Sequence, residues 1–459
     1  MATVTTVNPA TGQKLQEYPV MPPAEVFAAL EAADRAYRRW REVPAAARAA
    51  LLVPLAGVLR ENADRYARLM SLEMGKPVAE ARAEVEKCAW LCEFYAAQAP
   101  GWLADEPVAA DGLEHRIVYQ PLGVILSIMP WNYPFWQALR FGVPTIAAGN
   151  ASLLKHASNV TGCGLAIEEA FAAAGFPEGL FRTVVADHGT VAALLERDEV
   201  RGVSLTGSTE VGARIAELAG RNLKKVVLEL GGSDPFLVLE DADLEQAARG
   251  AVAGRLLCTG QSCIAAKRFI VVEAVAEAFS ARFAELMAEQ QVGDPLDPET
   301  TVGAIVNEQE LATLEAQLAE AVDRGATVLC GGRRLPGPGT FLPPTVVTGV
   351  TPDMRLATEE VFGPIAPVLV VAGEDEAVAL ANASEFGLGG SVWTRDLERG
   401  RRIARRIESG AVFVNHFTKS DPRMPFGGVK KSGLGRELSR FGLYEFVNIK
   451  GVNVYEAES

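Results

Sequence analysis

The sequence has 459 residues, of which 49% are hydrophobic and 22% charged, proportions typical of a soluble globular protein with two or three domains. Its net charge of -14 argues against nucleic acid as a partner, because binding to phosphate backbones requires a basic surface. A signal-peptide pattern and an apolar run of about 18 residues are both missing from the sequence, so we expect no membrane association.

The six cysteines are scattered and contain no CxxC pair, which is typical of a protein in the reducing cytoplasm. Cys88 and Cys92 are four residues apart in a helical pattern and therefore face the same side of a helix. A metal pair is one interpretation. Because no histidine lies nearby, packing inside a buried helix is favoured, and we expect no metal site.

The first 120 residues form an N-terminal segment of mixed character. Residues 1–20 are strand-like, and residues 22–98 have a helical pattern that is broken at Pro44 and Pro77, which predicts three or four amphipathic helices. His115 to Gln120 alternates between polar and apolar residues and is a candidate strand outside the main sheet.

Apolar strands alternate with helices from residue 123 onward, in two series separated by Gly231-Gly232. This alternation predicts two α/β domains with mostly parallel sheets, covered by helices on both faces. The first series has expected strands at 123–129, 152–155, 181–185, 202–206 and 225–229, with helices from 134, 159 and 209. The second has strands at 236–239, 268–272, 366–371, 390–394 and 411–414, and helices at 242–257, 274–291, 307–324, 375–383 and 396–408.

Three polar side chains stand where expected strands end or at glycine-rich turns. Asn132 follows the run Ile128-Met129-Pro130-Trp131, Glu229 precedes Gly231-Gly232, and Cys263 follows Gly260-Gln261-Ser262. A cysteine is nucleophilic as the thiolate, a carboxylate is a general base, and a side-chain amide stabilises an oxyanion. A lone cysteine is more often packing, but the three together indicate covalent catalysis.

A fourth pattern indicates a site for phosphate. Thr206-Gly207-Ser208-Thr209 joins an expected strand to an expected helix, and a helix N-terminus is a favourable site for a pyrophosphate. The usual G-x-G-x-x-G fingerprint after a strand is missing. A simple N-cap by Ser208 is the alternative interpretation.

Taken together, these motifs resemble those of the NAD(P)-dependent aldehyde dehydrogenase superfamily, from about residue 5 to residue 450. Six motifs occur in the order of that family: Pro130-Trp131-Asn132, Thr206-Gly207-Ser208-Thr209, Glu229-Leu230-Gly231-Gly232, Gly260-Gln261-Ser262-Cys263, Glu359-Glu360-Val361-Phe362-Gly363-Pro364 and Pro425-Phe426-Gly427-Gly428-Val429-Lys430.

The resemblance implies a mechanism and a cofactor site. Cys263 would attack the aldehyde, Asn132 and the backbone N–H of Cys263 would hold the oxyanion, and Glu229 would activate water to hydrolyse the thioester. In the cofactor site, Lys155 and Glu360 would bind the two riboses, Ser208 the pyrophosphate, and Phe362 would pack near the nicotinamide ribose. The full set of expected cofactor residues is Pro130, Trp131, Lys155, Ser158, Gly207, Ser208, Leu230, Glu360 and Phe362.

The resemblance also implies a domain plan. Residues 1–229 would form a cofactor-binding domain, residues 230–425 a catalytic domain with the nucleophile, and residues 426–459 a C-terminal return. The strand-like tail from residue 447 and residues 105–122 would form a small β element for oligomerisation, in a homodimer or homotetramer.

For the substrate, the segment Asn132 to Arg140 resembles that of succinate-semialdehyde dehydrogenases. The spacing of four predicts Asn132, Trp136 and Arg140 on one helix face, where a guanidinium would receive a carboxylate on the substrate. Ser420 would assist. The chain departs from many of these enzymes by having Leu257, not arginine, six residues before the nucleophile; Arg255 is two positions away.

The cofactor preference depends on Ser158. NAD-preferring members of the family often have glutamate three residues after the ribose-binding lysine, and that carboxylate would repel a 2′-phosphate. Here Ser158 and Lys155 would tolerate the phosphate, so we expect preference for NADP with NAD possible. His156 replaces the proline that usually follows this lysine.

Three other functions remain open at this point. A non-catalytic dinucleotide-binding relative would not need Asn132, Glu229 and Cys263 together. A CoA-acylating relative would not need the water-activating Glu229. A dehydrogenase for another aliphatic or aromatic aldehyde is separated from one for succinate semialdehyde only by its substrates.

Overall fold

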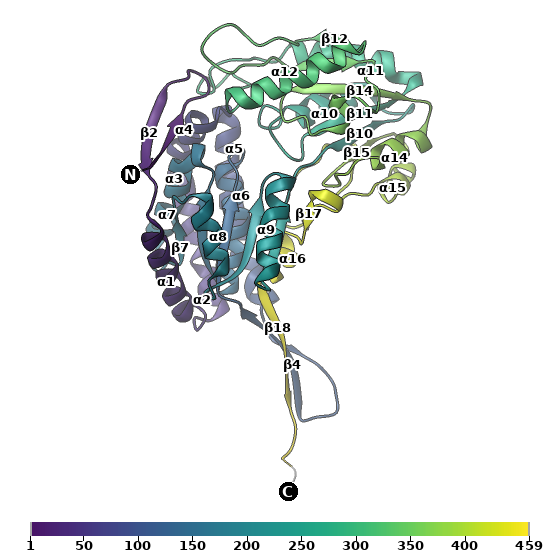
Figure 1. The fold of residues 1–459 in the computed structure, drawn as a ribbon. Coiled ribbons are helices and arrows are strands. Elements are labelled where there is room, and N and C mark those ends of the chain that lie inside the picture. The colour runs from purple at the N-terminus through teal and green to yellow at the C-terminus, as the bar shows by residue number, and fades with distance from the viewer. Residues whose placement is uncertain (1, 458–459) are drawn as a thin grey trace.

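The computed structural model describes residues 2–457 as two α/β lobes from which a β arm projects (Figure 1). The first lobe contains a six-stranded sheet in the order β17-β9-β8-β5-β6-β7, in which only the β17–β9 pair is antiparallel. Its strands are β5 (Val124–Met129), β6 (Ala151–His156), β7 (Phe181–Thr183), β8 (Val200–Thr206), β9 (Lys225–Glu229) and β17 (Gly433–Leu434).

Helices cover this sheet, as expected for central strands that are buried along almost their whole length. They are α6 (Pro134–Ala148), η1 (Ser158–Val160), α7 (Thr161–Ala173), α8 (His188–Glu196) and α9 (Thr209–Arg221). The N-terminal helical segment packs onto the same lobe as five helices where three or four were expected. They are α1 (Pro23–Trp40), α2 (Ala45–Ala50), α3 (Leu52–Glu61), α4 (Ala63–Met74) and α5 (Val78–Trp102), preceded by the hairpin β1 (Thr3–Val7) and β2 (Lys14–Pro19).

The cysteines in this segment lie in the core. Cys88 and Cys92 are both on α5 and both are fully buried among apolar side chains. Their positions agree with the packing interpretation.

The second lobe contains a seven-stranded sheet in the order β12-β13-β14-β11-β10-β15-β16, parallel except for β12. Its strands are β10 (Asp234–Val238), β11 (Ala266–Val272), β12 (Thr327–Cys330), β13 (Thr345–Thr348), β14 (Ile365–Val371), β15 (Ser391–Trp393) and β16 (Phe413–Val414). Its helices are α10 (Leu244–Leu256), α11 (Glu273–Ala288), α12 (Glu308–Asp323), α13 (Arg355–Thr358), α14 (Glu374–Asn382) and α15 (Leu397–Ala404).

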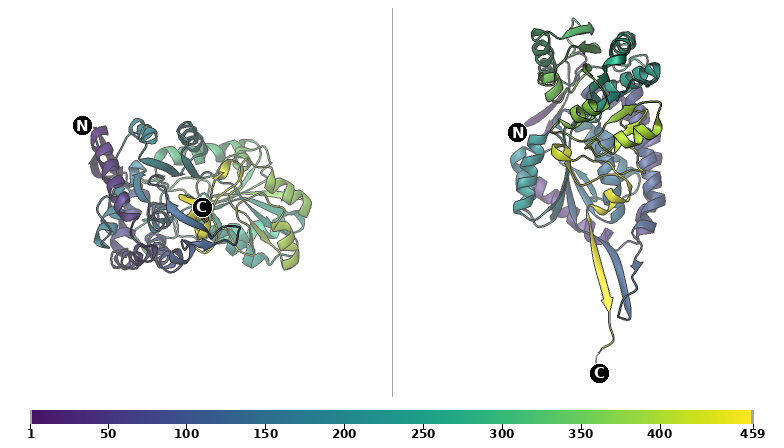
Figure 2. Two further views of the ribbon diagram at one scale, coloured as in Figure 1. Left: turned by 90° about the horizontal axis from the view of Figure 1, so that it is seen from below. Right: turned by 90° about the vertical axis from the view of Figure 1, so that its right-hand side faces the viewer.

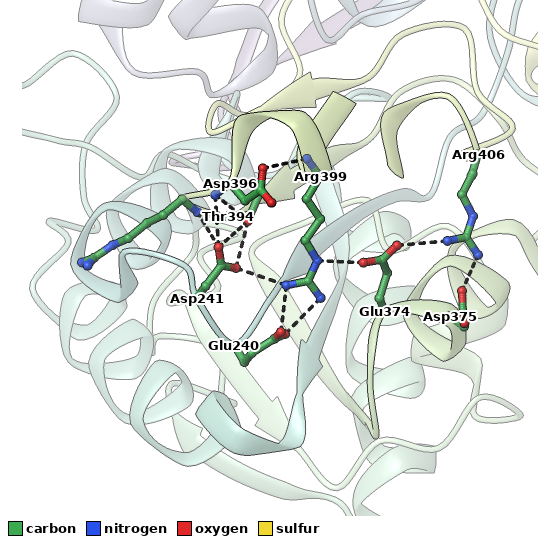
Figure 3. A network of polar contacts seen from close by, with 9 residues as sticks. Glu240, Asp241, Glu374, Asp375, Thr394, Asp396, Arg399 and Arg406 are labelled. Atoms are coloured by element: carbon green, nitrogen blue, oxygen red, sulfur yellow. Dashed lines mark hydrogen bonds and ion pairs between the residues drawn. The ribbon is translucent and has the colours of Figure 1, made fainter. Parts of the chain in front are cut away.

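A polar network fixes one margin of this second sheet (Figure 3). Arg399, on α15, contacts Glu240 after β10 and Glu374 at the start of α14, each at 2.7 Å. Asp241 accepts hydrogen bonds from the Thr394 hydroxyl at 2.7 Å and from the Asp396 backbone at 3.1 Å. Single surface ion pairs stabilise little. This network, however, joins the three segments that follow β10, β14 and β15 at the carboxyl ends of these strands.

The C-terminal segment returns to the first lobe before it enters the arm. It contributes η2 (Lys430–Ser432), β17 and α16 (Ser439–Tyr444), and β17 pairs directly with the end of β9 at Glu229. The arm consists of β3 (Glu106–Pro107), β4 (Glu114–Pro121) and β18 (Val447–Val454), all antiparallel. It extends away from both lobes in Figure 1 and in the right-hand view of Figure 2.

Within residues 2–457, no single helix is long and apolar enough to cross a membrane. The helical stretches Pro23–Trp40 and Ala45–Glu61 have the length and apolar composition of a membrane span only when they are taken as one segment, and they are bent by 120° relative to each other.

Candidate active site

The loop before Cys263 has an unusual backbone. Cys258, Thr259 and Gly260 follow one another with φ of 55°, 59° and 78°, the left-handed region that costs energy for the two residues with a Cβ. Their neighbours fix this conformation, because the Cys258 N–H donates to Glu80 at 2.9 Å and the Thr259 hydroxyl accepts from the Gly303 N–H at 2.9 Å.

A buried arginine fixes the same loop from the other side. The Arg255 guanidinium donates to the carbonyls of Gly260 at 2.8 Å, Val361 at 3.0 Å and Gly363 at 2.5 Å. Arg255 is fully buried, so it does not occupy the place of the missing substrate arginine. Instead it joins the nucleophile loop to the segment that contains Phe362.

Cys263 lies where two cavities meet, and its side chain is partly exposed there. One cavity, of about 230 Å³, has largely apolar walls that include Trp136, Leu257, Ile264 and Phe426. The other, of about 280 Å³, contains seven of the nine expected cofactor residues: Pro130, Trp131, Gly207, Ser208, Leu230, Glu360 and Phe362. The nucleophile therefore faces both cavities.

The second cavity fits a dinucleotide by the chemistry of its walls. Ser208 caps α9, whose first backbone N–H groups face an anion favourably, and Trp131 and Phe362 meet edge to face at 5.7 Å. The Glu360 carboxylate accepts the Gly232 N–H at 3.0 Å and is thereby held at the wall of this cavity, where a carboxylate could accept a hydrogen bond from a ribose hydroxyl.

Gly231 and Gly232 are required here by close approach. A Cβ on Gly231 would lie 2.7 Å from the Glu360 carboxylate, and one on Gly232 would lie 2.5 Å from the Cys263 carbonyl oxygen. The two glycines after Glu229 therefore allow the Glu360 carboxylate and the backbone of Cys263 to lie directly against the end of β9.

The other two expected cofactor residues lie on β6 and on η1, which follows it. Lys155 pairs with Ile128 across β6 and β5, and burial lowers its pKa. Ser158 is the exposed first residue of η1. The buried His156 ring contacts the Pro134 carbonyl at 2.9 Å, so this loop is attached to the start of α6.

The amide of Asn132 is held by two buried neighbours. Its Nδ2 donates to the Gln261 carbonyl at 2.9 Å, and its Oδ1 accepts from Gln137 Nε2 at 3.0 Å. These contacts fix the orientation of the amide, with Nδ2 toward Gln261 and Oδ1 toward Gln137. The second N–H of Nδ2 can therefore donate to a substrate oxygen. Asn132 precedes α6, so the predicted single helical face contains Trp136 and Arg140 but not Asn132.

Glu229 ends β9 and is 2% exposed. Neither of its carboxylate oxygens has a hydrogen-bond partner among residues 2–457. Burial, and then the nearby Glu437 carboxylate, raise the pKa of Glu229 to about 8. A Cβ on Gly427 would lie 2.7 Å from Glu229 Oε1, so the glycine of the C-terminal return gives this carboxylate its space. Such a carboxylate is a base suited to neutral or slightly alkaline pH.

Burial raises the pKa of the Cys263 thiol to about 12, although the positive charges of Lys267 and Arg140 act to lower it. The thiol is therefore protonated at rest, and attack requires a base that removes its proton. Lys267 is fully buried and donates to the carbonyls of Ser262 at 2.7 Å and Cys263 at 2.8 Å. It also lies 3.3 Å from Glu360, so one ammonium contacts both the backbone of Cys263 and the Glu360 carboxylate.

Arg140 lies in the wall of the first cavity, but its charge is already compensated. Its guanidinium forms a buried ion pair with Glu437 and lies 4.5 Å from the centre of the Phe426 ring. The expectation that a substrate carboxylate pairs with Arg140 omitted Glu437, which comes from the C-terminal return almost 300 residues later in the chain. Trp136 and Ser420 line this cavity as expected.

Sequence reasoning missed several residues that shape the site, namely Lys87, Gln137, Lys267 and Glu437, and it considered Arg255 only as a substrate cation. Lys267 had a usable signal, because it is a lysine four residues after the nucleophile in a strand that is fully buried and apolar after Arg268. Lys87 and Glu437 had none, because the fold brings them to the site from distant segments.

Known proteins resemble this chain along almost its whole length. The profile of the aldehyde dehydrogenase family matches residues 2–452. The chain is 49% identical to a probable succinate-semialdehyde dehydrogenase [NADP(+)] of Synechocystis, over 98% of this chain and 99% of that one. It is 46% identical to the Escherichia coli succinate semialdehyde dehydrogenase [NAD(P)+] Sad, over 97% and 96%.

Among solved structures, the succinic semialdehyde dehydrogenase of Streptococcus pyogenes in complex with NADP+ superposes with a TM-score of 0.96 at 37% identity. The superposition covers 99% of this chain and all of that one. With a family match along almost its whole length, this chain belongs to the aldehyde dehydrogenase family.

Proposed function

We propose that the chain oxidises succinate semialdehyde to succinate, with NADP as the preferred cofactor and Cys263 as the nucleophile. The observation that carries the proposal is the position of Cys263 at the junction of a cavity with dinucleotide-binding chemistry and a second, largely apolar cavity. The names of the Synechocystis and Streptococcus relatives support the same substrate and cofactor.

In the first half of the reaction, the Cys263 sulfur attacks the aldehyde carbon and its proton passes to Glu229. The carbonyl oxygen becomes an oxyanion, which the free Nδ2–H of Asn132 stabilises; one donor of this kind contributes about 3–4 kcal/mol in other enzymes. NADP, when bound, supplies the hydride acceptor that oxidises the thiohemiacetal to a thioester. Lys267 keeps the backbone of Cys263 fixed during these steps.

In the second half, Glu229 acts again as the base. It has released its first proton to solvent and takes another from the water that attacks the thioester carbonyl. The C–S bond breaks, the carboxylic acid leaves, and Cys263 recovers its proton. The absence of hydrogen bonds from residues 2–457 to the Glu229 oxygens leaves them available for that water.

The proposal extends to the state of the protein in the cell. The six cysteines are free, which supports a reducing compartment, and we place the enzyme in the cytoplasm. We also propose a homodimer or homotetramer joined through the β arm, because the arm projects beyond both lobes (Figure 1).

A substrate and cofactor panel tests the function. We expect kcat/KM to be higher for succinate semialdehyde than for butanal, a neutral aldehyde of equal length, and higher with NADP than with NAD. A higher kcat/KM with butanal would replace the proposal by a dehydrogenase of neutral aldehydes, and no reduced cofactor with any aldehyde would indicate a non-catalytic relative.

The variant Ser158→Glu tests the cofactor preference. Ser158 is exposed next to the strand of Lys155, and a carboxylate there would face the 2′-phosphate of NADP. A like-charge contact costs several kcal/mol, so we expect the ratio of kcat/KM for NADP over NAD to fall by roughly 100-fold. An unchanged ratio would show that the 2′-phosphate binds elsewhere.

A further inference from the structure

Three charged side chains at the start of α5 lie beneath the site and take no part in the reaction described above. Glu80 and Glu84 are one turn apart on α5, and Lys76 stands two residues before its first turn. Lys76 is fully buried, and both carboxylates line the first cavity. Buried charges are costly unless partners compensate them, so the partners of these three groups indicate what they hold.

Glu84 holds the beginning of α6. One of its oxygens accepts the backbone N–H groups of Phe135 and Trp136, both at 2.9 Å, in the first turn of that helix. Tyr133, the residue before α6, supplies no side-chain cap. Because the first N–H groups of a helix have no partner within it, a carboxylate from α5 takes the place of the usual cap. Asn132 precedes this turn and is thereby tied to α5.

Glu80 holds the loop that leads to the nucleophile. Its carboxylate accepts the Cys258 N–H at 2.9 Å, at the first of the three consecutive residues with positive φ. The thiol of Cys258 in turn donates to the Asn132 carbonyl at 3.1 Å. A strained backbone persists only where its neighbours hold it, so the approach to Cys263 depends on Glu80.

Lys76 serves both carboxylates. It forms a buried ion pair with Glu84 and lies 3.9 Å from the centre of the Tyr133 ring. Burial raises the pKa of Glu80 to about 7, and the Lys76 charge acts to lower it. One ammonium therefore balances the two carboxylates that hold α6 and the nucleophile loop.

We propose that Lys76 is a positioning residue that sets the separation of the oxyanion donor Asn132 and the nucleophile Cys263. Glu84 transmits its effect to the start of α6, and Glu80 transmits it to the loop before the nucleophile. The donor and the nucleophile belong to different lobes, so neither sheet alone sets their separation, and an error of about 1 Å there can cost about 100-fold in rate. This inference rests on the proposed function, in which both groups act on one aldehyde carbonyl.

The variant Lys76→Met tests this role, because it keeps the aliphatic stem and removes the charge. We expect kcat to fall by roughly 10- to 100-fold with succinate semialdehyde and with butanal alike, while each KM stays within about threefold. A loss confined to kcat indicates misplaced reacting groups, whereas general damage to the fold also weakens substrate binding. An unchanged kcat would show that Lys76 only supports the structure.

Glu80→Met tests the contact with the nucleophile loop without breaking the buried ion pair. Iodoacetamide alkylates Cys263 without any oxyanion donor, and mass spectrometry of the Cys263 peptide gives the rate. We expect this rate to fall by roughly fivefold and kcat by roughly 10-fold, because a relaxed loop withdraws the thiol from the Lys267 and Arg140 charges that favour the thiolate. Glu73→Met is the matched control. Glu73 is a buried carboxylate that accepts two N–H groups at the start of α7, both at 3.0 Å, so its loss should lower the melting temperature and leave both rates within about twofold.

The outcomes separate this inference from the proposed function. A wild type that prefers butanal would overturn the proposed substrate and leave the positioning role standing, because the expected loss is the same for both aldehydes. A wild type that reduces no cofactor with any aldehyde would overturn both. If Lys76→Met fails to fold, as judged by thermal melting, Glu80→Met decides: a kcat and an alkylation rate within about twofold of the wild type would overturn the positioning role.

Discussion

Glu229 shows how the surroundings of one residue set its chemistry. Burial and the Glu437 charge raise its pKa to about 8, and its oxygens have no hydrogen-bond partner within residues 2–457. A raised pKa means that the carboxyl is protonated, and inactive as a base, at pH values well below 8. We therefore expect the rate of thioester hydrolysis to rise with pH through about 8 and then to level off.

The variant Glu229→Gln should lose this dependence, because an amide neither titrates nor accepts the proton. We expect steady-state turnover to fall by roughly 100- to 10,000-fold, the usual contribution of a general base. The measurements are kcat against pH for both proteins and a stopped-flow trace of reduced cofactor at neutral pH. Cys263→Ala, which cannot form a thioester, is the control and should give no product at all. Full steady-state turnover by Glu229→Gln would show that another group activates the water.

Residues with a local sequence context were predictable, and residues that depend on distant packing were not. Cys263, Asn132 and Glu229 stand next to glycines or at strand ends, so the sequence indicates their position directly. Arg140 is the opposite case. Its position on α6 follows from the local sequence. The buried Glu437 that compensates its charge comes from the C-terminal return, which the local sequence does not indicate.

At the scale of elements, α6 and the C-terminal return form one unit around the base. Arg140 on α6 pairs with Glu437, whose carboxylate also accepts a hydrogen bond from Ser204 on β8 at 3.4 Å. The Glu437 charge raises the pKa of Glu229, and the Arg140 charge lowers it. The ion pair therefore affects both the stability of this lobe and the pH range of the base.

The variant Glu437→Gln should change both properties. Removing one partner of a buried ion pair leaves the other charge uncompensated, which costs about 3–5 kcal/mol. Without the Glu437 charge the pKa of Glu229 falls, so the midpoint of hydrolysis against pH should move below that of the wild type. Thermal denaturation and the pH profile measure the two effects.

The double variant Arg140→Met with Glu437→Gln is the control for this pair. It removes both charges, so its stability should exceed that of Glu437→Gln alone. A pH midpoint that stays at the wild-type value in Glu437→Gln would mean that burial alone sets the pKa of Glu229.

The elements themselves were predicted best where strands are apolar and buried on both faces. The strand at 225–229 was placed with its correct ends, and β5, β6 and β11 differ from expectation by one or two residues. β12, β13 and β17 were missed. β12 and β17 lie at sheet edges, and all three are only two to four residues long, so their apolar pattern is too short to distinguish from a loop.

At the scale of the whole molecule, the site exists only because distant segments meet. The first lobe supplies Asn132 and Glu229, and the second supplies Cys263 and Glu360. α5 supplies Lys87 and the segment after β16 supplies Ser420, while the C-terminal return closes the site through Gly427. The same return continues into β18, so the chain that completes the site also forms the arm.

The arm exposes several apolar side chains to solvent. β18 pairs with β4 along eight residues, yet Ile449, Val452, Val454 and Tyr455 remain 36–58% exposed. Apolar side chains on a narrow projecting sheet are poorly stabilised without a covering surface. A second copy of this chain would supply that surface.

We therefore expect the wild type to have a mass in solution of two or four times 48.9 kDa, measured by size-exclusion chromatography with light scattering. Replacing Val452 and Val454 by lysine should shift the mass toward that of one chain, because like charges would face each other across the interface. Val53→Lys is the matched control, since Val53 is 55% exposed on α3, in the body of the first lobe, and its replacement should leave the mass unchanged. A wild type that elutes as a single chain would contradict a role of the arm in assembly.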